Sequence, residues 1–127
     1  MRALSVSLCA LFAVATFPLA AAAEHNDVIT VKLNEGCSVE DYVKIKDDFN
    51  AMWGKDNGYR AEIAVPIQAT DLTTVFWIGH TANATAFGNA WDMWRDALAD
   101  SKSIPAKLNA RFTKCGTNLN RSGFDVL

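Results

Sequence analysis

The sequence offers few side chains for acid–base chemistry, and His80 is the main candidate. The chain has two histidines, His25 in the polar stretch after residue 23 and His80 at the end of an apolar run. An imidazole titrates near neutral pH, so His80 could act as a general base. The simpler hypothesis, which we favour, is a strand-end histidine bonded to a loop carbonyl. We expect His25 to lie in a flexible N-terminal segment.

No spacing typical of a metal site or an activated nucleophile occurs in the chain. The motifs H-x-x-x-H, C-x-x-C and G-x-S-x-G are absent, and so is a glycine-rich phosphate loop. The neighbouring carboxylates Asp47 and Asp48 lie on the polar face of an expected helix, where they are solvated. We therefore predict that the protein binds no metal and no cofactor.

The segment AFGNAWDMWRDAL, residues 86–98, places two tryptophans among acidic side chains. On a helix, Trp91 and Trp94 fall on one apolar stripe, whereas Asp92 and Asp96 fall on the opposite face. The carboxylates therefore point away from the indoles, which rules out an acid–tryptophan site. The two tryptophans are expected to face the interior, either as closely packed core or as walls of an apolar pocket.

Residues 1–23 have the features of a secretory signal. Arg2 precedes a long uncharged run that closes with alanines, and we predict cleavage after Ala23. A retained anchor is the alternative, but Pro18 and the alanine-rich end fit cleavage better. The mature chain, residues 24–127, is then one secreted or periplasmic domain that does not insert into a membrane.

The two cysteines of the mature part are expected to form a disulfide. Cys9 leaves with the signal, which leaves Cys37 and Cys115 as an even pair in an exported protein. A redox-active pair would more often be C-x-x-C, and a metal site would need further ligands.

The charge balance argues against nucleic acid as a partner. The formal net charge is −2, and the chain has no block of basic residues. Domains that bind nucleic acid usually carry a basic patch.

Hydrophobic periodicity predicts four strands and three helices. Apolar residues alternate in the strand segments and recur every three or four residues in the helical ones. Ser38 and Ser103 are placed to begin two helices, and Gly54 and Gly116 to end them. Strands are expected over 28–33, 59–65, 73–80 and 121–127, and helices over 39–53, 84–99 and 104–115.

The element order β-α-β-β-α-(α)-β predicts an α+β, ferredoxin-like fold. Its antiparallel sheet has the strand order 4-1-3-2, with the helices on one face. Pro66 suits the edge position of the second strand, since proline cannot donate to a sheet ladder. The topology also brings Cys37, after the first strand, close to Cys115, before the fourth.

One face of this sheet is expected to need a cover. The third strand carries Val75 and Trp77 on one side and Phe76 and Ile78 on the other, although both helices cover the same face. Apolar patches of this kind are rarely left in water. We therefore predict a homodimer that packs sheet against sheet.

The predicted topology resembles the dimeric α+β barrel superfamily, which includes antibiotic-biosynthesis-monooxygenase-like domains, over residues 28–127. The stretches AFGNAWDMWRDALAD and SIPAKLNARFTKC also resemble a group of uncharacterised exported bacterial proteins. Members of the superfamily include cofactor-free oxygenases and haem-degrading enzymes. The haem-degrading members carry a histidine on the second helix, and residues 84–99 contain none.

Enzymes of this superfamily often place Asn, Trp and His around a cavity between helices and sheet. The resemblance therefore implies a pocket whose lining includes Asn34, Trp77, His80, Trp91 and Trp94. His80 would be its only candidate catalytic residue.

Two classes of function remain. The first is a binding or structural module without chemistry, which dimerises through its sheet. The alternative is a cofactor-free monooxygenase- or isomerase-like enzyme that acts on an apolar aromatic ligand in a tryptophan-lined pocket. The absence of an acid–base pair at a recognisable spacing favours the first.

Overall fold

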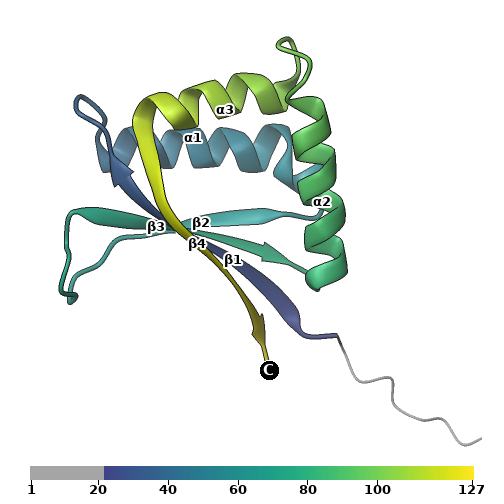
Figure 1. Cartoon of the computed structure of the whole chain (residues 1–127), viewed down its shortest axis with the longest axis horizontal. Helices are drawn as coiled ribbons and strands as arrows, with labels where there is room; N and C mark the ends of the chain where they lie inside the picture. Colours follow the sequence, from purple (N-terminus) through teal and green to yellow (C-terminus); the bar gives the residue numbers. More distant parts are fainter. Residues whose placement is uncertain (1–21) are drawn as a thin grey trace, which may run out of the picture.

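The computed structural model describes residues 22–127, in which three helices cover one face of a four-stranded antiparallel sheet (Figure 1). The predicted signal sequence lies, except for Ala22 and Ala23, outside the described residues, and its cleavage stays a prediction. Within residues 22–127, no helix combines the length and apolar character needed to cross a bilayer. The strands are β1 (Glu24–Leu33), β2 (Arg60–Ala64), β3 (Thr74–Thr81) and β4 (Gly116–Val126), and the helices are α1 (Val39–Met52), α2 (Ala84–Ala97) and α3 (Ile104–Cys115), with a short 3₁₀ turn, η1 (Gly54–Asp56).

The sheet order is β2-β3-β1-β4, which confirms the predicted ferredoxin-like order. All three pairings are antiparallel. β2 is an edge strand, which agrees with Pro66 just after its end. β3 lies between β2 and β1, as its two apolar faces indicated.

Two strands are longer than the sequence pattern predicted. β1 begins at Glu24 and β4 at Gly116, and the two pair along their whole length with one irregularity after Thr30. The added residues are mostly polar, so alternation of apolar residues did not reveal them. The expectation of a flexible segment around His25 was therefore wrong, since His25 pairs with Thr81 on one side and Asp125 on the other.

The helix starts follow the predicted capping chemistry. The Ser38 hydroxyl accepts from the Asp41 amide, and the Asp41 carboxylate accepts from the Ser38 amide, which completes a capping box. Ser103 caps α3 in the same way through the amide of Ala106, with proline in the first turn. These contacts satisfy amides that have no partner inside the helix.

Phe49 of α1 is the centre of the core. Its ring centroid lies 5.0–6.3 Å from those of five other aromatic residues. Tilted and edge-on ring pairs of this kind contribute beyond the area that they bury. Two of the partners flank elements: one follows the end of α1 and one precedes β2. The other three lie in β3, α2 and α3. In chain order the five are Trp53, Tyr59, Trp77, Trp94 and Phe112.

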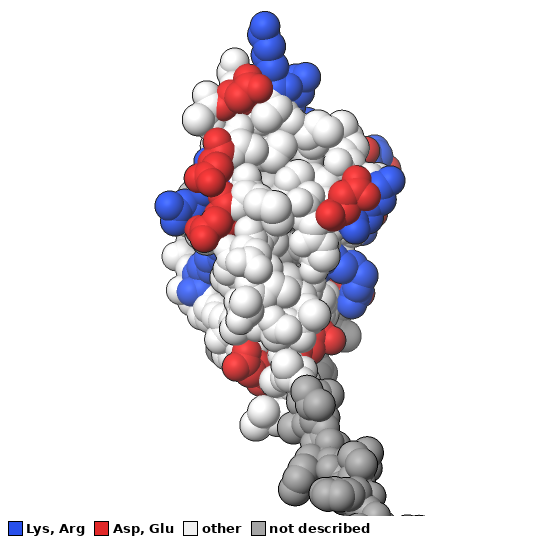
Figure 2. Space-filling view, turned by 90° about the vertical axis from the view of Figure 1, so that its right-hand side faces the viewer, with Lys and Arg blue, Asp and Glu red and all other residues white. Residues whose placement is uncertain are grey.

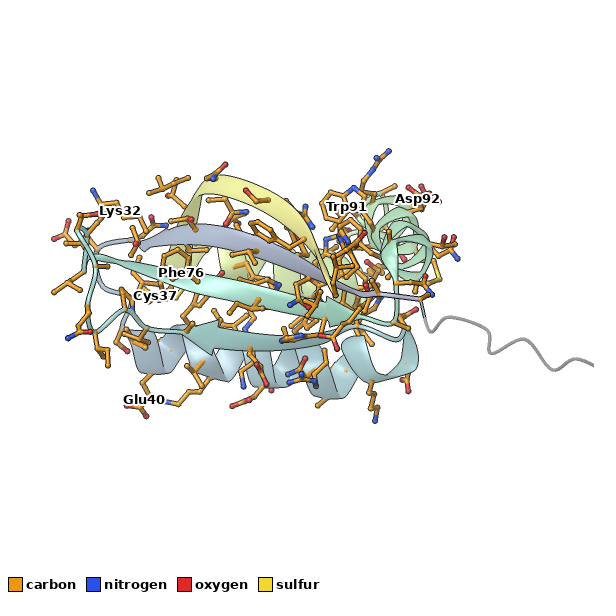
Figure 3. All side chains as sticks on the ribbon, turned by 90° about the horizontal axis from the view of Figure 1, so that it is seen from below. Lys32, Cys37, Glu40, Phe76, Trp91 and Asp92 are labelled. Atoms are coloured by element: carbon orange, nitrogen blue, oxygen red, sulfur yellow. A yellow bond between two sulfur atoms is a disulfide. The ribbon has the colours of Figure 1, made fainter. Side chains whose placement is uncertain are left out.

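The helix α2 stands across one end of the sheet, whereas α1 and α3 lie side by side over it (Figure 1). Trp94 is buried and Trp91 half-buried, whereas Asp92 and Asp96 are exposed, as the helical pattern predicted. Figure 3 shows Trp91 and Asp92 on different sides of α2. Seen from this end, the molecule has a broad strip without charged side chains, with acidic and basic groups along both sides (Figure 2).

The opposite face of the sheet is called the outer face below, and no helix of residues 22–127 lies over it. Since Val75 and Trp77 are buried under the helices, alternation along β3 directs Phe76 and Ile78 to the outer face, where both are half-buried. Phe76 is labelled in Figure 3. Ile78 pairs with Val28 across β1. The outer face is therefore apolar along its centre.

A disulfide joins Cys37 to Cys115, which confirms the predicted pairing. The two Cα atoms are 5.2 Å apart, within the range usual for disulfides. The Asn34 amide also donates to the Cys115 carbonyl at 2.9 Å, so the bond lies where β1 ends and β4 begins.

Replacing both cysteines by alanine is expected to lower the free energy of unfolding by about 4 kcal/mol. The bond closes a loop with a sequence separation of 78 residues, and a cross-link of that length restricts the unfolded chain strongly. Urea unfolding of the mature chain measures the difference. Reductant should reproduce it in the wild type and change nothing in the double variant; equal stability of both proteins would contradict the expectation.

Candidate functional site

A cavity of ≈ 140 Å³ lies between the sheet and the helices. An engineered apolar cavity of about 150 Å³ in another protein binds benzene, so this space fits one six-membered ring. The lining is mainly aromatic, with Ile29 and Ala90 as its aliphatic members. The aromatic side chains that line it are Tyr42, Phe49, Trp53, Tyr59, Trp77, Trp91, Trp94 and Phe112.

One wall of the cavity is polar and is built around Asp27. The carboxylate of Asp27 is 2 % exposed and accepts from Nε and Nη2 of Arg121, each at 2.7 Å. The hydroxyl of Tyr59 donates to the same carboxylate at 2.7 Å, and the indole of Trp77 donates to that hydroxyl at 3.0 Å. The buried carboxylate is thus fully paired, which is the condition under which a buried charge is tolerated.

Strand geometry explains how these groups meet. Asp27 occupies an inward position of β1, and it pairs with Gly79 of β3 and Gly123 of β4. Gly79 has no side chain, and the ring of Tyr59 passes over it to reach Asp27; a Cβ at Gly79 would overlap the Tyr59 hydroxyl. Gly79 is therefore required for this arrangement.

Arg121 is held on two sides. Its guanidinium carbon lies 3.9 Å from the ring centroid of Trp91 and 5.6 Å from that of Phe87. Stacking of this kind is attractive, because the ring face carries partial negative charge. The side chain of Arg121 is 34 % exposed, so it stands at the border between the cavity and solvent.

The tyrosines and the arginine of the lining are not suited to proton transfer near neutral pH. Burial, with a further contribution from the charge of Asp27, raises the pKa of Tyr59 far above its usual range, and burial raises the pKa of Tyr42 to about 12. Burial would lower the pKa of Arg121, but hydrogen bonds to Asp27 and its charge outweigh this and raise that pKa. Both tyrosines are therefore neutral at neutral pH and Arg121 is charged.

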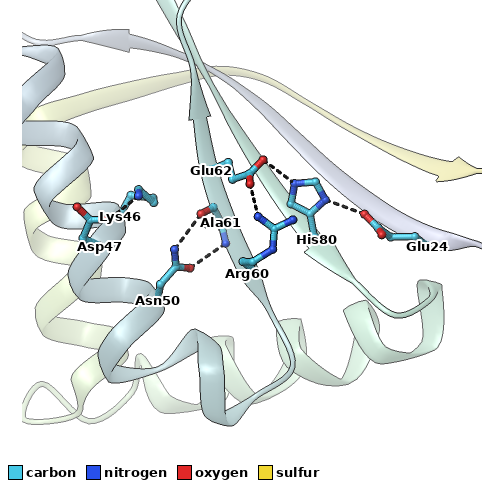
Figure 4. A network of polar contacts seen from close by, with 8 residues as sticks. All are labelled: Glu24, Lys46, Asp47, Asn50, Arg60, Ala61, Glu62 and His80. Atoms are coloured by element: carbon cyan, nitrogen blue, oxygen red, sulfur yellow. Dashed lines mark hydrogen bonds and ion pairs between the residues drawn. The ribbon is translucent and has the colours of Figure 1, made fainter.

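His80 lies on the outer face and does not line the cavity. Its Nδ1 is 2.7 Å from Glu24 and its Nε2 is 3.3 Å from Glu62, which also pairs with Arg60 (Figure 4). Alternation along β3 explains the placement. His80 comes three positions after Trp77, and residues at an odd offset along a strand point to opposite faces. Its partners are carboxylates and not the loop carbonyl that we expected.

Asn34 also lies away from the cavity. Its side-chain amide donates to the carbonyls of Thr113 and Lys114, and its oxygen accepts from the Thr117 hydroxyl at 2.8 Å. These bonds tie the end of β1 to the junction of α3 and β4. Asn34 therefore has a structural position.

Of the candidate pocket residues, Trp77, Trp91 and Trp94 line the cavity. Their role in ligand binding stays a prediction. The sequence analysis missed Asp27, Tyr59 and Arg121. A signal for Asp27 was present, because a charged residue stands in register with the apolar positions 29, 31 and 33 of the same strand.

His25 forms a second polar contact, near the N-terminal end of β1. Its Nδ1 is 2.8 Å from Asp125, and its ring lies 4.8 Å from that of Phe87. His25 and Asp125 are direct cross-strand partners, so the contact is that of an ordinary strand pair.

Comparison with known proteins supports the fold. No protein-family model matches the chain, and no curated protein matches it in sequence. Among solved structures, the chain is similar to SnoaB, a cofactor-independent oxygenase from Streptomyces nogalater, with a TM-score of 0.56 and 10% identity over 84% of this chain and 95% of that one. A conserved Bacteroides thetaiotaomicron protein of unknown function, described as a possible oxidoreductase, has a TM-score of 0.53 and 11% identity over 82% and 98% of the two chains.

A third similar structure is a dimeric protein of unknown function with a ferredoxin-like fold from Bacteroides fragilis, with a TM-score of 0.44 and 10% identity. It covers 81% of this chain and 96% of that one. At identities of 10–11%, the likeness to SnoaB and to the Bacteroides thetaiotaomicron protein concerns the fold alone. The resemblance to exported bacterial proteins stays a prediction.

Gly79→Ala is expected to destabilise the protein by about 2 kcal/mol, because the new methyl group displaces the Tyr59 ring and breaks its bond to Asp27. Urea unfolding measures the loss, and the fluorescence of Trp77 should change with it.

Gly88→Ala is the matched control. A Cβ at Gly88 meets nothing within 4 Å, and alanine is the better helix former, so stability should stay equal or rise by up to about 1 kcal/mol. Equal stability of the Gly79 variant and the wild type would contradict the role given to Gly79.

Proposed function

We propose that this protein binds a small apolar or aromatic molecule in the cavity and performs no chemistry on it. The observation that carries this proposal is a ring-sized aromatic cavity with one fully paired polar wall. Pockets for small molecules are commonly apolar, with a few polar groups that orient the ligand.

The proton chemistry of the lining favours binding over catalysis. Among residues 22–127, the cavity lining includes no histidine, cysteine or lysine, and its tyrosines are held neutral. Asp27 accepts from Arg121 and Tyr59 together, so its oxygens are already engaged. A general base needs an available acceptor within reach of the substrate proton.

A cofactor-independent oxygenase is the second candidate. SnoaB, which shares the fold, is described as one, and a cavity with three tryptophans suits an aromatic substrate. In such a reaction the ligand itself would have to supply the reactive carbanion or radical, because the lining offers no free base.

We also propose that the protein works as a homodimer through the outer face. Phe124 and Val126 of β4 are 54% and 51% exposed, and they extend the apolar centre formed by Phe76 and Ile78. One end of this face carries both signs of charge, with Glu24, Glu62, Arg60 and His80. A second copy would cover the apolar centre and could pair opposite charges about a two-fold axis.

An exported location is consistent with the disulfide, since such bonds persist in oxidising compartments. We propose secretion or transfer to a periplasm, with cleavage after Ala23, so that β1 begins at the mature N-terminus.

Ala90→Leu is expected to abolish binding of ring-sized apolar molecules, because the larger side chain fills the cavity from α2. Calorimetric titration with α-methylstyrene measures the loss. Ala84→Leu, at an exposed position of the same helix, should bind as the wild type does. Binding unaffected by Ala90→Leu would place the ligand elsewhere, and absence of binding to the wild type by any single-ring probe would contradict the proposal.

Oxygen uptake separates the two candidate functions. With aromatic probes in aerobic buffer, we expect no uptake above the rate without protein. Uptake that is lost in Ala90→Leu would support the oxygenase instead.

Phe76→Lys is expected to shift the mature protein from dimer to monomer at micromolar concentration, because it places a charge in the centre of the outer face. Sedimentation equilibrium measures the mass. Ile67→Lys is the control, since Ile67 is 89% exposed in the loop after β2, and that variant should remain dimeric. A monomeric wild type would overturn the dimer.

A further inference from the structure

We propose that Arg121 recognises the ligand, and that the cavity selects a single-ring molecule bearing an uncharged acceptor oxygen over the matching carboxylate. The chemical class is thus a small aromatic ketone, aldehyde or amide. This inference rests on the proposed binding function and adds the group that orients the ligand.

The guanidinium of Arg121 has donors left over. Asp27 engages Nε and Nη2, and within residues 22–127 Nη1 has no hydrogen-bond partner. Both protons of Nη1 point away from Asp27, because the carboxylate occupies the opposite edge of the planar group. A lining residue thus presents charged donors at the border of a mainly aromatic space.

The orientation of these donors is fixed before a ligand arrives. The bidentate contact to Asp27 holds one edge of the guanidinium, and the ring of Trp91 at 3.9 Å holds one face. A donor held in this way loses little conformational entropy on binding. The arrangement therefore suits recognition of an acceptor atom at a defined place.

The charge balance decides which acceptor fits. Asp27 and Arg121 carry opposite charges, and the residues that line the cavity include no other charged side chain. A carboxylate ligand would bring a second negative charge near the buried Asp27 without a second cation to offset it. A carbonyl oxygen accepts from Nη1 without that repulsion.

The mouth of the cavity suits the polar end of such a molecule. Asn109 of α3 and Asn118 of β4 line the cavity together with Arg121, and Arg121 and Asn118 are both solvent-exposed. The aromatic walls lie deeper, with Trp77 and Phe49 buried. The ring is therefore expected to enter first, with its oxygen at Arg121.

Three probes of nearly the same shape test the inference by calorimetric titration: acetophenone, benzoate and α-methylstyrene, in which a methylene replaces the carbonyl oxygen. They are measured on the wild type, on Asp27→Asn and on Asp27→Asn/Arg121→Met. The double variant removes the donor without leaving a buried carboxylate unpaired, and methionine keeps an extended side chain near Trp91. Circular dichroism checks that each variant is folded.

The ratio of acetophenone to α-methylstyrene affinity should fall about tenfold from the wild type to the double variant, because a hydrogen bond to a charged donor is lost. Asp27→Asn leaves Arg121 with an uncompensated charge, so the affinity for benzoate should rise about tenfold over the wild type. The double variant lacks this charge, so it should lose that gain. A residue with a purely structural role would produce no such gain.

An unchanged ratio together with unchanged benzoate affinity would overturn the role of Arg121, even if α-methylstyrene still binds in a manner that Ala90→Leu abolishes. If none of the three probes binds the wild type, the binding function itself fails. A further measurement needs only the wild type, so it tests the inference even if the variants are unstable. The side-chain ¹⁵N signals of Arg121 should shift with acetophenone and stay in place with α-methylstyrene, and the absence of that difference would equally overturn the inference.

Discussion

The carboxylate of Asp27 is buried beneath the helices, and its need for partners organises the sheet around it. The partners come from separate parts of the chain: Arg121 of β4, Tyr59 just before β2 and, through Tyr59, Trp77 of β3. A buried carboxylate without such partners would be strongly unfavourable. The network therefore links the strands at one level of the sheet and forms a polar wall of a mainly aromatic interior.

The aromatic interior explains why a cavity remains in so small a domain. Large planar side chains have few rotamers, and edge-on packing around Phe49 fixes the directions in which they point. Space that flexible aliphatic chains could fill stays open below Trp91 and beside Ala90. The wall that faces this space has charge and hydrogen-bond donors but no free base, which is why binding is the function that the geometry supports best.

The fold was accessible from sequence because its signals are local. Alternation in β3, the proline after β2, the capping serine of α1 and the two cysteines each restrict the topology independently. Helical spacing likewise separated Trp91 and Trp94 from the neighbouring carboxylates. The ends of β1 and β4 were not predicted, because their pairing depends on a partner strand distant in sequence and their added residues are polar.

The candidate site likewise combines features with local sequence signals and features that depend on contacts between distant segments. The sequence by itself determined the order of the elements, the disulfide partners and the faces to which the tryptophans point, since each follows from periodicity or from cysteine count. It could also have placed His80 on the outer face, by strand parity with Trp77. Only the tertiary structure decided that Asp27, Tyr59 and Arg121 meet. Asp27 and Arg121 are separated by 94 residues, and the absence of a side chain at Gly79 lets the Tyr59 ring reach Asp27. A contact of that kind depends on how two strands and a turn approach one another in space, and no periodicity along the chain encodes that distance.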